Sequence, residues 1–180
     1  MQPLRLASFS TDNKGGNPAG VVIAPQHPSD QEMRQIAADL GYSETAFASP
    51  QDDAWRVRYF APESEVPFCG HATVALGAAL AAQHGNGVYT LVLNDTTITV
   101  EGHSENGQMR AALQSPATHS NPAAPDLTAA ALAMLGLDPD DLDPRFTPSF
   151  AGAGATHLIL ALNSRDTLAA MSYDLAAGRD

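Results

Sequence analysis

The sequence predicts an α+β fold: a lobe of mixed β-strands wrapped around a central buried helix, followed by the start of a second, similar lobe. Residues 70–83 carry almost no charge on any face, and a helix that is apolar all round is a buried one. This helix should therefore run through the middle of a β-structure. The order of glycine-rich loop, apolar strand and Ser-initiated helix at 15–40 also recurs at 152–171, as a weak internal repeat.

Three regions are expected along the chain. Residues 1–115 should form the first lobe, 116–149 a linker and a short helix, and 150–180 an incomplete start of the second lobe. The stretch 115–125 holds three prolines among Ser, Asn, Ala and Thr, which is typical of a loop or linker. After Met171 the sequence supplies neither a second buried helix nor strands to wrap it.

The strands of the first lobe are predicted where apolar, β-branched and aromatic residues run together or alternate with polar ones. These segments are 4–9, 21–24, 43–48, 55–60, 88–93, 96–101 and 108–113. Turn residues at 11–18 separate the first two, and Asn94-Asp95 is a hairpin signal between 88–93 and 96–101.

The helix before the central one has clear start and stop signals. Ser29 and Glu32 have the spacing of a capping box, the apolar residues after them recur at i, i+3, i+4 and i+7, and Gly41 is placed to end the helix. The elements expected beyond the linker are an Ala-rich helix at 127–135, an acidic turn at 138–144, an apolar strand at 157–162 and a helix starting at Ser164 with Leu168 and Met171 on one face.

Composition narrows the classes of function. The formal charge of −11 argues against nucleic-acid binding through a basic patch and against docking on anionic membranes. No apolar run approaches the ~20 residues that cross a bilayer, and the N-terminus lacks the pattern of a secretory signal. A single cysteine, Cys69, can form neither an internal disulfide nor a zinc cluster built on cysteines. We expect a soluble cytoplasmic protein.

Glu44 is the first candidate for chemistry. It interrupts the apolar and small-residue run YSETAF directly after a helix. A carboxylate held among Tyr42, Ala46 and Phe47 should be partly desolvated, which suits general acid/base work. The alternative is an edge-strand glutamate that points to water, and the pattern alone favours it because structural carboxylates outnumber catalytic ones.

The segment FCGHAT, which leads into the central helix, is the second candidate. The free amides at a helix N-terminus form an anion site, and Gly70 lets a ligand approach the backbone. His71 could then donate or relay a proton to a bound carboxylate. It could equally cap its helix, with Cys69 a small buried residue.

Two weaker candidates remain. The loop GNPAG could present backbone amides and the Asn17 side chain to a ligand, but a tight turn explains it as well. Cys69 and His71 also suggest a thiol mechanism. Adjacency in sequence does not make a thiolate–imidazole pair, and a two-thiol racemase needs a second cysteine, so we rank this chemistry low and expect no loss of activity in Cys69→Ala.

Taken in order, the segments GGNPAGVV, YSETAF, a Phe-x-Pro-x-x-Glu stretch (Phe60, Pro62, Glu65) and FCGHATVALG resemble the PhzF-like phenazine-biosynthesis isomerase family. The likeness covers roughly the first ninety residues. The segment GAGATHLILALNSRDTLAAM is similar to the opening of that family's second half, though less specifically.

The resemblance implies a diaminopimelate-epimerase-like fold, in which two similar lobes each wrap strands around a central helix and the active site lies in the cleft between them. The family's namesake isomerises dihydro-hydroxyanthranilate by a cofactor-free proton shift, with a glutamate as general acid/base. The resemblance therefore implies an isomerase acting on a small carboxylated metabolite, with no cofactor and no metal.

The same resemblance assigns residues. Glu44 falls on the catalytic glutamate and His71 on the histidine that lines the cleft. The expected substrate-binding residues are Asn17, Ser43, Gly70 and Thr73.

The sequence also departs from the family, because it ends at Asp180, before the cleft residues of the second lobe. Two such chains could complete each other's cleft as a homodimer, which a mass measurement in solution would test. The alternative function is a non-catalytic protein of the same fold that binds a small ligand or a partner.

Overall fold

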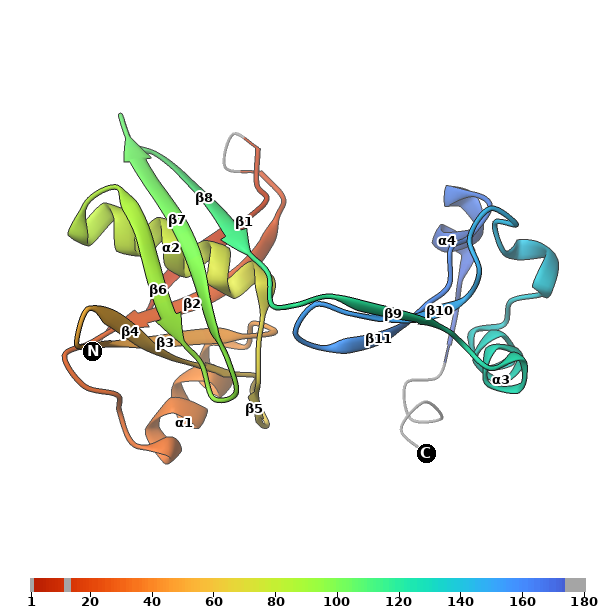
Figure 1. The fold of residues 1–180 in the computed structure, drawn as a ribbon, viewed down its shortest axis with the longest axis horizontal. Coiled ribbons are helices and arrows are strands. Elements are labelled where there is room, and N and C mark those ends of the chain that lie inside the picture. The colour runs from red at the N-terminus through yellow and green to blue at the C-terminus, as the bar shows by residue number, and fades with distance from the viewer. Residues whose placement is uncertain (1, 12–13, 174–180) are drawn as a thin grey trace. The chain divides into compact units, whose positions relative to one another are not determined.

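The computed structural model describes residues 2–11 and 14–173 (Figure 1). Its contacts divide the chain into two units, Met1–Ala117 and Thr118–Asp180, which are described in turn. In the part of the chain that the structure describes, no helix is both long and apolar enough to cross a membrane.

The first unit is built on one mixed sheet in the order β1-β2-β3-β4-β6-β7-β8, with β5 paired to β4. The strands are β1 Leu4–Ser8, β2 Asn17–Ile23, β3 Thr45–Gln51, β4 Ala54–Phe60, β5 Glu65–Val66, β6 Gly87–Val92, β7 Thr97–Glu105 and β8 Gln108–Gln114. The pairs β2–β3 and β4–β6 are parallel, and the other neighbours are antiparallel. The predicted mixed sheet is confirmed.

The central helix α2, Gly70–His84, runs inside this sheet (Figure 1). It contacts β1, β2 and β3 on one side and β7 and β8 on the other. Leu76 and Leu80 have no exposed surface. The helix is surrounded because it has no polar face to turn to water, and the prediction of a buried helix over 70–83 is confirmed.

Two glycines let α2 approach β7 closely. A Cβ atom added at Gly102 would clash with the carbonyl oxygen of Gly77, and one added at Gly77 would clash with the side chain of Val100. Hydrogen atoms at both positions allow the helix backbone to lie directly against the strand.

The helix α1, Asp30–Leu40, covers the opposite face of the sheet. Its Met33 and Ala37 pack with Val22, Phe47 and Phe60, whereas the preceding residue on each of those strands (Val21, Ala46 and Tyr59) joins the core around α2. Successive side chains of a strand point to opposite faces, so the central strands are buried on both sides.

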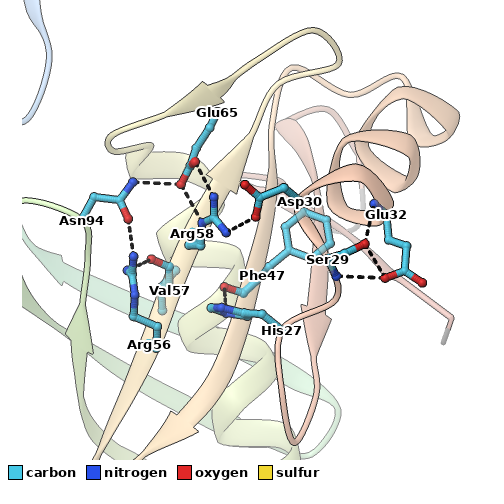
Figure 2. Close-up of polar contacts among 10 residues, drawn as sticks. All are labelled: His27, Ser29, Asp30, Glu32, Phe47, Arg56, Val57, Arg58, Glu65 and Asn94. Carbon is cyan, nitrogen blue, oxygen red and sulfur yellow. Dashed lines mark hydrogen bonds and ion pairs between the residues drawn. The ribbon is translucent and has the colours of Figure 1, made fainter.

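The predicted capping box starts α1. The Ser29 amide donates to Glu32 Oε2 at 2.9 Å, and the Glu32 amide donates to Ser29 Oγ at 3.3 Å (Figure 2). Gly41 ends the helix in the left-handed conformation, with φ of 65°. Both predicted boundaries of this helix are confirmed.

A polar network on the same side ties α1 to two strands and to the turn between β6 and β7 (Figure 2). Arg58 on β4 donates two parallel hydrogen bonds to Glu65 on β5, at 2.8 and 2.6 Å, and a third to Asp30 at 2.6 Å. Asn94, in the turn between β6 and β7, donates to Glu65 Oε1 at 2.8 Å. The bidentate pair holds the pKa of Glu65 below its ordinary value.

The residues from Asn17 to Gly20 were expected in a loop, but they form the first part of β2, which begins at Asn17. Asn17 is opposite Ser8 and Pro18 is opposite Ala7 on β1, whereas β3 joins only from Gly20 onward. Pro18 therefore lies in the part of β2 that pairs on one side only, where a proline is tolerated.

The second unit contains a three-stranded antiparallel sheet in the order β11-β10-β9. Its elements are β9 His119–Pro122, α3 Pro125–Leu135, the short 3-10 helix Pro139–Asp141, β10 Ser149–Gly152, β11 Thr156–Ile159 and α4 Arg165–Ala170. Ser164 caps α4 by accepting from the Thr167 amide at 3.0 Å, as Ser29 caps α1. The Ser-initiated helix is confirmed, although Met171 lies just outside it, and the strand predicted over 157–162 is confirmed only as far as Ile159.

The strand β9 corrects the prediction of a loop or linker over 115–125. His119 to Pro122 pair with β10, and β9 lies at the edge of this sheet. A proline such as Pro122 is tolerated in an edge strand because only one side of the strand forms hydrogen bonds to a neighbour. Proline content alone therefore overestimated the loop. The boundaries 1–115, 116–149 and 150–180 for lobes and linker stay a prediction.

Candidate active site

Glu44 lies between the end of α1 and the first residue of β3. Its carbonyl oxygen accepts a hydrogen bond from the Gly20 amide at 3.2 Å, which fixes the backbone at this point. The side chain keeps 23% of its surface exposed. The carboxylate is thus neither a fully solvated edge residue nor sealed in the core, which leaves it open to a ligand on one side.

His71 faces Glu44 from the first turn of α2. Its Nε2 lies 3.6 Å from Glu44 Oε2 and 3.5 Å from Ser43 Oγ, and its side chain is 11% exposed. The cap position of α2 belongs to Cys69, whose side chain makes no capping hydrogen bond. The histidine ring is therefore directed at Ser43 and Glu44 and does not cap its own helix.

Cys69 completes the cluster beneath these two side chains. Its thiol donates to Glu44 Oε2 at 3.4 Å, and its Sγ lies 3.2 Å from His71 Nδ1. Burial, and to a smaller extent the Glu44 charge, raise the pKa of the Cys69 thiol to about 12. A thiol with that pKa stays protonated near neutrality, which supports the low rank given to thiol chemistry.

Thr73 supports the site from inside. It has no exposed surface, and its hydroxyl donates to the Cys69 carbonyl at 2.7 Å while lying 2.7 Å from the Tyr59 hydroxyl. Because the Thr73 hydrogen is engaged by the carbonyl, Tyr59 is the donor of the second bond. A side chain without exposed surface offers no face to a substrate, so Thr73 is placed to position the start of α2.

Gly70 is half-buried at the start of α2, and Asn17 is exposed at the start of β2. A Cβ atom at Gly70 would meet nothing closer than Leu113 Cδ2, at 3.8 Å, so packing inside the protein does not demand a glycine there. Asn17 is opposite Ser8 on β1. The structure thus brings Glu44, Ser43 and His71 together, with Gly70 adjacent to His71 in the chain.

Two residues at the site carried no sequence signal. Ser8, which is 5% exposed, donates to the carbonyl oxygen of His71 at 2.6 Å and so links β1 to the first turn of α2. Tyr59 holds Thr73 as described, and burial raises its pKa. A serine at a strand end and a tyrosine in an alternating strand look like ordinary sheet residues until the fold places them under α2.

The cluster combines two kinds of chemistry. A partly exposed carboxylate beside an imidazole can accept and return a proton. The unpaired amides at the start of α2 and the positive end of its dipole favour an anionic group nearby. A small acid with an exchangeable carbon-bound proton is the kind of molecule that both features suit.

Comparisons with known proteins identify a matching family and related proteins. Residues 6–180 match the family model described as phenazine biosynthesis-like protein, PhzC-PhzF. The uncharacterized isomerase YddE of Escherichia coli strain K12 is 33% identical over 98% of this chain and 61% of its own length. The chain therefore spans less than two thirds of this curated relative.

Solved structures agree with this match. A phenazine biosynthesis protein of the PhzF family from Bacillus anthracis superposes with a TM-score of 0.80 and 25% identity, over 96% of this chain and 59% of the other. A predicted epimerase from Pseudomonas aeruginosa gives a TM-score of 0.88 at 20% identity, over 98% of this chain and 64% of the other, which shows the fold alone. The expected diaminopimelate-epimerase-like fold is confirmed.

Proposed function

Because the chain belongs to the phenazine biosynthesis-like family, PhzC-PhzF, we propose that it is an isomerase that shifts a proton on a small carboxylated metabolite, with Glu44 as general acid/base. The observation that carries the proposal is the meeting of the Glu44 carboxylate with the His71 ring, 3.6 Å apart at the N-terminus of α2. Relatives that are named isomerases support the reaction class.

In the proposed reaction, Glu44 takes a proton from an acidic carbon of the substrate. The C–H bond breaks, an O–H bond forms on the carboxylate, and the electron pair moves into the conjugated system of the substrate. Glu44 then returns the proton to a different carbon, which restores the carboxylate and leaves the double bonds shifted. No atoms are gained or lost, so the step needs no oxidant, reductant or cofactor.

The other residues have supporting roles in this proposal. The substrate carboxylate lies against the amides at the start of α2, where Gly70 allows close approach. His71 and Ser43 hold the polar groups of the substrate and orient Glu44, and Asn17 contacts the substrate from the start of β2. Thr73 acts from below as a positioning residue.

The remaining expectations stay proposals of the same kind. A homodimer, a cytoplasmic location and a biosynthetic role like that of phenazine enzymes are each consistent with the family. The location and the biosynthetic role can each fail without affecting the catalytic assignment, whereas a homodimer would complete the cleft in which Glu44 acts.

Solvent-deuterium exchange tests the proposal. The purified protein is incubated in deuterium oxide with dihydro-hydroxyanthranilate and with a panel of small unsaturated carboxylates, and label on carbon is followed by mass spectrometry. We expect Glu44→Gln to lower exchange by ~10²–10⁴-fold, the usual contribution of a general base, while ligand binding is largely kept because the substituted side chain has nearly the same shape.

The chain offers a matched control. Glu101 and His103 on β7 form a second carboxylate–histidine pair, 2.8 Å apart and about half exposed. Glu101→Gln removes the same charge and should leave exchange unchanged. Exchange that survives at the wild-type rate in Glu44→Gln would rule out Glu44 as the base. A wild-type protein that binds a carboxylate of the panel without exchanging it would support the non-catalytic alternative.

A further inference from the structure

Three side-chain atoms of different chemistry converge at the start of α2. The thiol of Cys69, the carboxylate of Glu44 and the ring of His71 each place one donor atom within 4.8 Å of the other two. The Cys69 Sγ lies 3.4 Å from Glu44 Oε2 and 3.2 Å from His71 Nδ1. Proton transfer by a carboxylate and an imidazole does not by itself require a sulfur atom between them.

These separations are those of ligands around a tetrahedral zinc ion. With Zn–S near 2.3 Å and Zn–N or Zn–O near 2.0 Å, neighbouring ligand atoms lie about 3.3–3.6 Å apart. The two sulfur distances, 3.2 Å to His71 Nδ1 and 3.4 Å to Glu44 Oε2, lie close to that range, and every pair of the three ligand atoms lies within 4.8 Å. Rotation of the His71 and Glu44 side chains toward each other would allow all three atoms to contact one ion.

We propose that Cys69, Glu44 and His71 form a zinc site, in which the fourth coordination position is open to solvent. Thiolate, imidazole and carboxylate are the three ligand types that zinc takes in proteins. Binding releases the Cys69 proton to solvent and forms the Zn–S bond. The thiolate and the carboxylate together then balance the two charges of the ion, while the imidazole binds in its neutral form.

The surroundings of the cluster fit this assignment. The start of α2 repels a bare cation, but the thiolate and the carboxylate neutralise the two charges of the zinc ion, so the complex carries no net charge there. Ser43 Oγ lies 3.5 Å from His71 Nε2, where it can hold the ring while Nδ1 faces the metal, as outer partners of metal-bound histidines do.

Zinc at this site would regulate the enzyme by inhibiting it. A metal ion that occupies the Glu44 oxygen and the His71 ring leaves the carboxylate unable to accept a proton from carbon. This consequence depends on the function proposed for Glu44, whereas binding of the ion does not. The site would be a place where zinc competes with the substrate.

Titration with cobalt(II), a spectroscopic stand-in for zinc, tests the binding. Metal-free protein should take up one equivalent, with a thiolate-to-cobalt charge-transfer band in the near ultraviolet and intense visible bands of a tetrahedral complex. Added zinc should abolish both. Cys69→Ser should lose the charge-transfer band, and His71→Asn should weaken binding by more than the ~10–100-fold that an outer partner contributes.

The exposed pair on β7 again supplies the control. His103→Asn should leave the cobalt spectrum unchanged, and circular dichroism should show that each variant is folded. Wild-type protein without a charge-transfer band, or a band that persists in folded Cys69→Ser, would overturn the zinc site.

Exchange measurements separate this inference from the proposed function. We expect added zinc to suppress deuterium exchange in wild-type protein and a chelator to restore it. Zinc that binds without suppressing exchange would confirm the site and contradict Glu44 as the base. If exchange depends on Glu44 but the protein takes up no cobalt, Glu44 is supported as the base and the zinc site is contradicted.

Discussion

The Nε2 atom of His71 lies 3.6 Å from Oε2 of Glu44. In the sequence the two residues are far apart, because Glu44 precedes β3 and His71 follows β4 and β5. The start of β3 supplies the carboxylate, and the first turn of α2 supplies the ring. Their meeting depends on how firmly the start of α2 is held.

Ser8→Ala should loosen the start of α2. The substitution removes the Ser8 hydroxyl, which donates to the His71 carbonyl at 2.6 Å, and loss of one such hydrogen bond costs ~0.5–1.5 kcal/mol. We expect a lower free energy of unfolding in urea. In the exchange assay we expect a reduced kcat and a smaller change in KM. Ser10→Ala, at an exposed position two residues later, is the control and should change neither. Equal turnover in Ser8→Ala and wild type would contradict a positioning role for Ser8.

Gly102→Ala should destabilise the first unit. The new Cβ atom would clash with the carbonyl oxygen of Gly77, and overpacking of this kind costs ~1–3 kcal/mol. Urea denaturation measures the loss.

Gly70→Ala is the matched substitution at the site. Its Cβ atom would have 3.8 Å to the nearest atom, Leu113 Cδ2, so we expect the free energy of unfolding to stay within ~0.5 kcal/mol of wild type. Binding of a carboxylate ligand should weaken because the methyl group lies over the amides at the start of α2. Undiminished ligand affinity in Gly70→Ala would remove the argument that a ligand approaches the backbone there.

Acid should weaken the network around Arg58. The pKa of Glu65 is held below its ordinary value of 4.5, first by hydrogen bonds from Arg58. A carboxyl group with a lowered pKa in the folded state adds stability above its unfolded pKa, and this contribution is lost as pH falls through the folded value. The free energy of unfolding should therefore drop as pH decreases below about 4.5.

Glu65→Gln should flatten that part of the pH profile, whereas Glu63→Gln, at an exposed neighbouring position, should not. Urea denaturation at a series of pH values between neutrality and strong acid gives the comparison. A profile of Glu65→Gln that matches wild type would show that the Arg58 pair does not contribute to acid stability.

Local patterns predicted the helices and most strands well. The spacing of Ser29 and Glu32, the glycine at 41 and the uncharged run at 70–83 are each read from neighbouring residues, and helix capping and burial depend mainly on such local features. The Ser-initiated helix after Ser164 was predicted in the same way. The strand β9 was missed because its pairing with β10 depends on residues far along the chain.

For the candidate site, the sequence and its family resemblance singled out Glu44, His71, Asn17, Ser43, Gly70 and Thr73. The fold brings Glu44, Ser43 and His71 together, with the Cys69 thiol beside them. The sequence did not indicate that Thr73 is fully buried or that Ser8 holds the His71 carbonyl. Those facts depend on which face of α2 and which end of β1 turn inward. Sequence periodicity does not specify them for a helix that is apolar on every side.

The amino-acid sequence by itself determined that a buried helix lies within a mixed β-structure, and the order of its motifs was enough to indicate the family. Both follow from residue types at short spacings. Only the tertiary structure decided that the carboxylate of Glu44, the ring of His71 and the thiol of Cys69 share one small space, at the positive end of α2. The physical reason is that their separation is set by the curl of the sheet around the helix, which is a property of packing among distant strands.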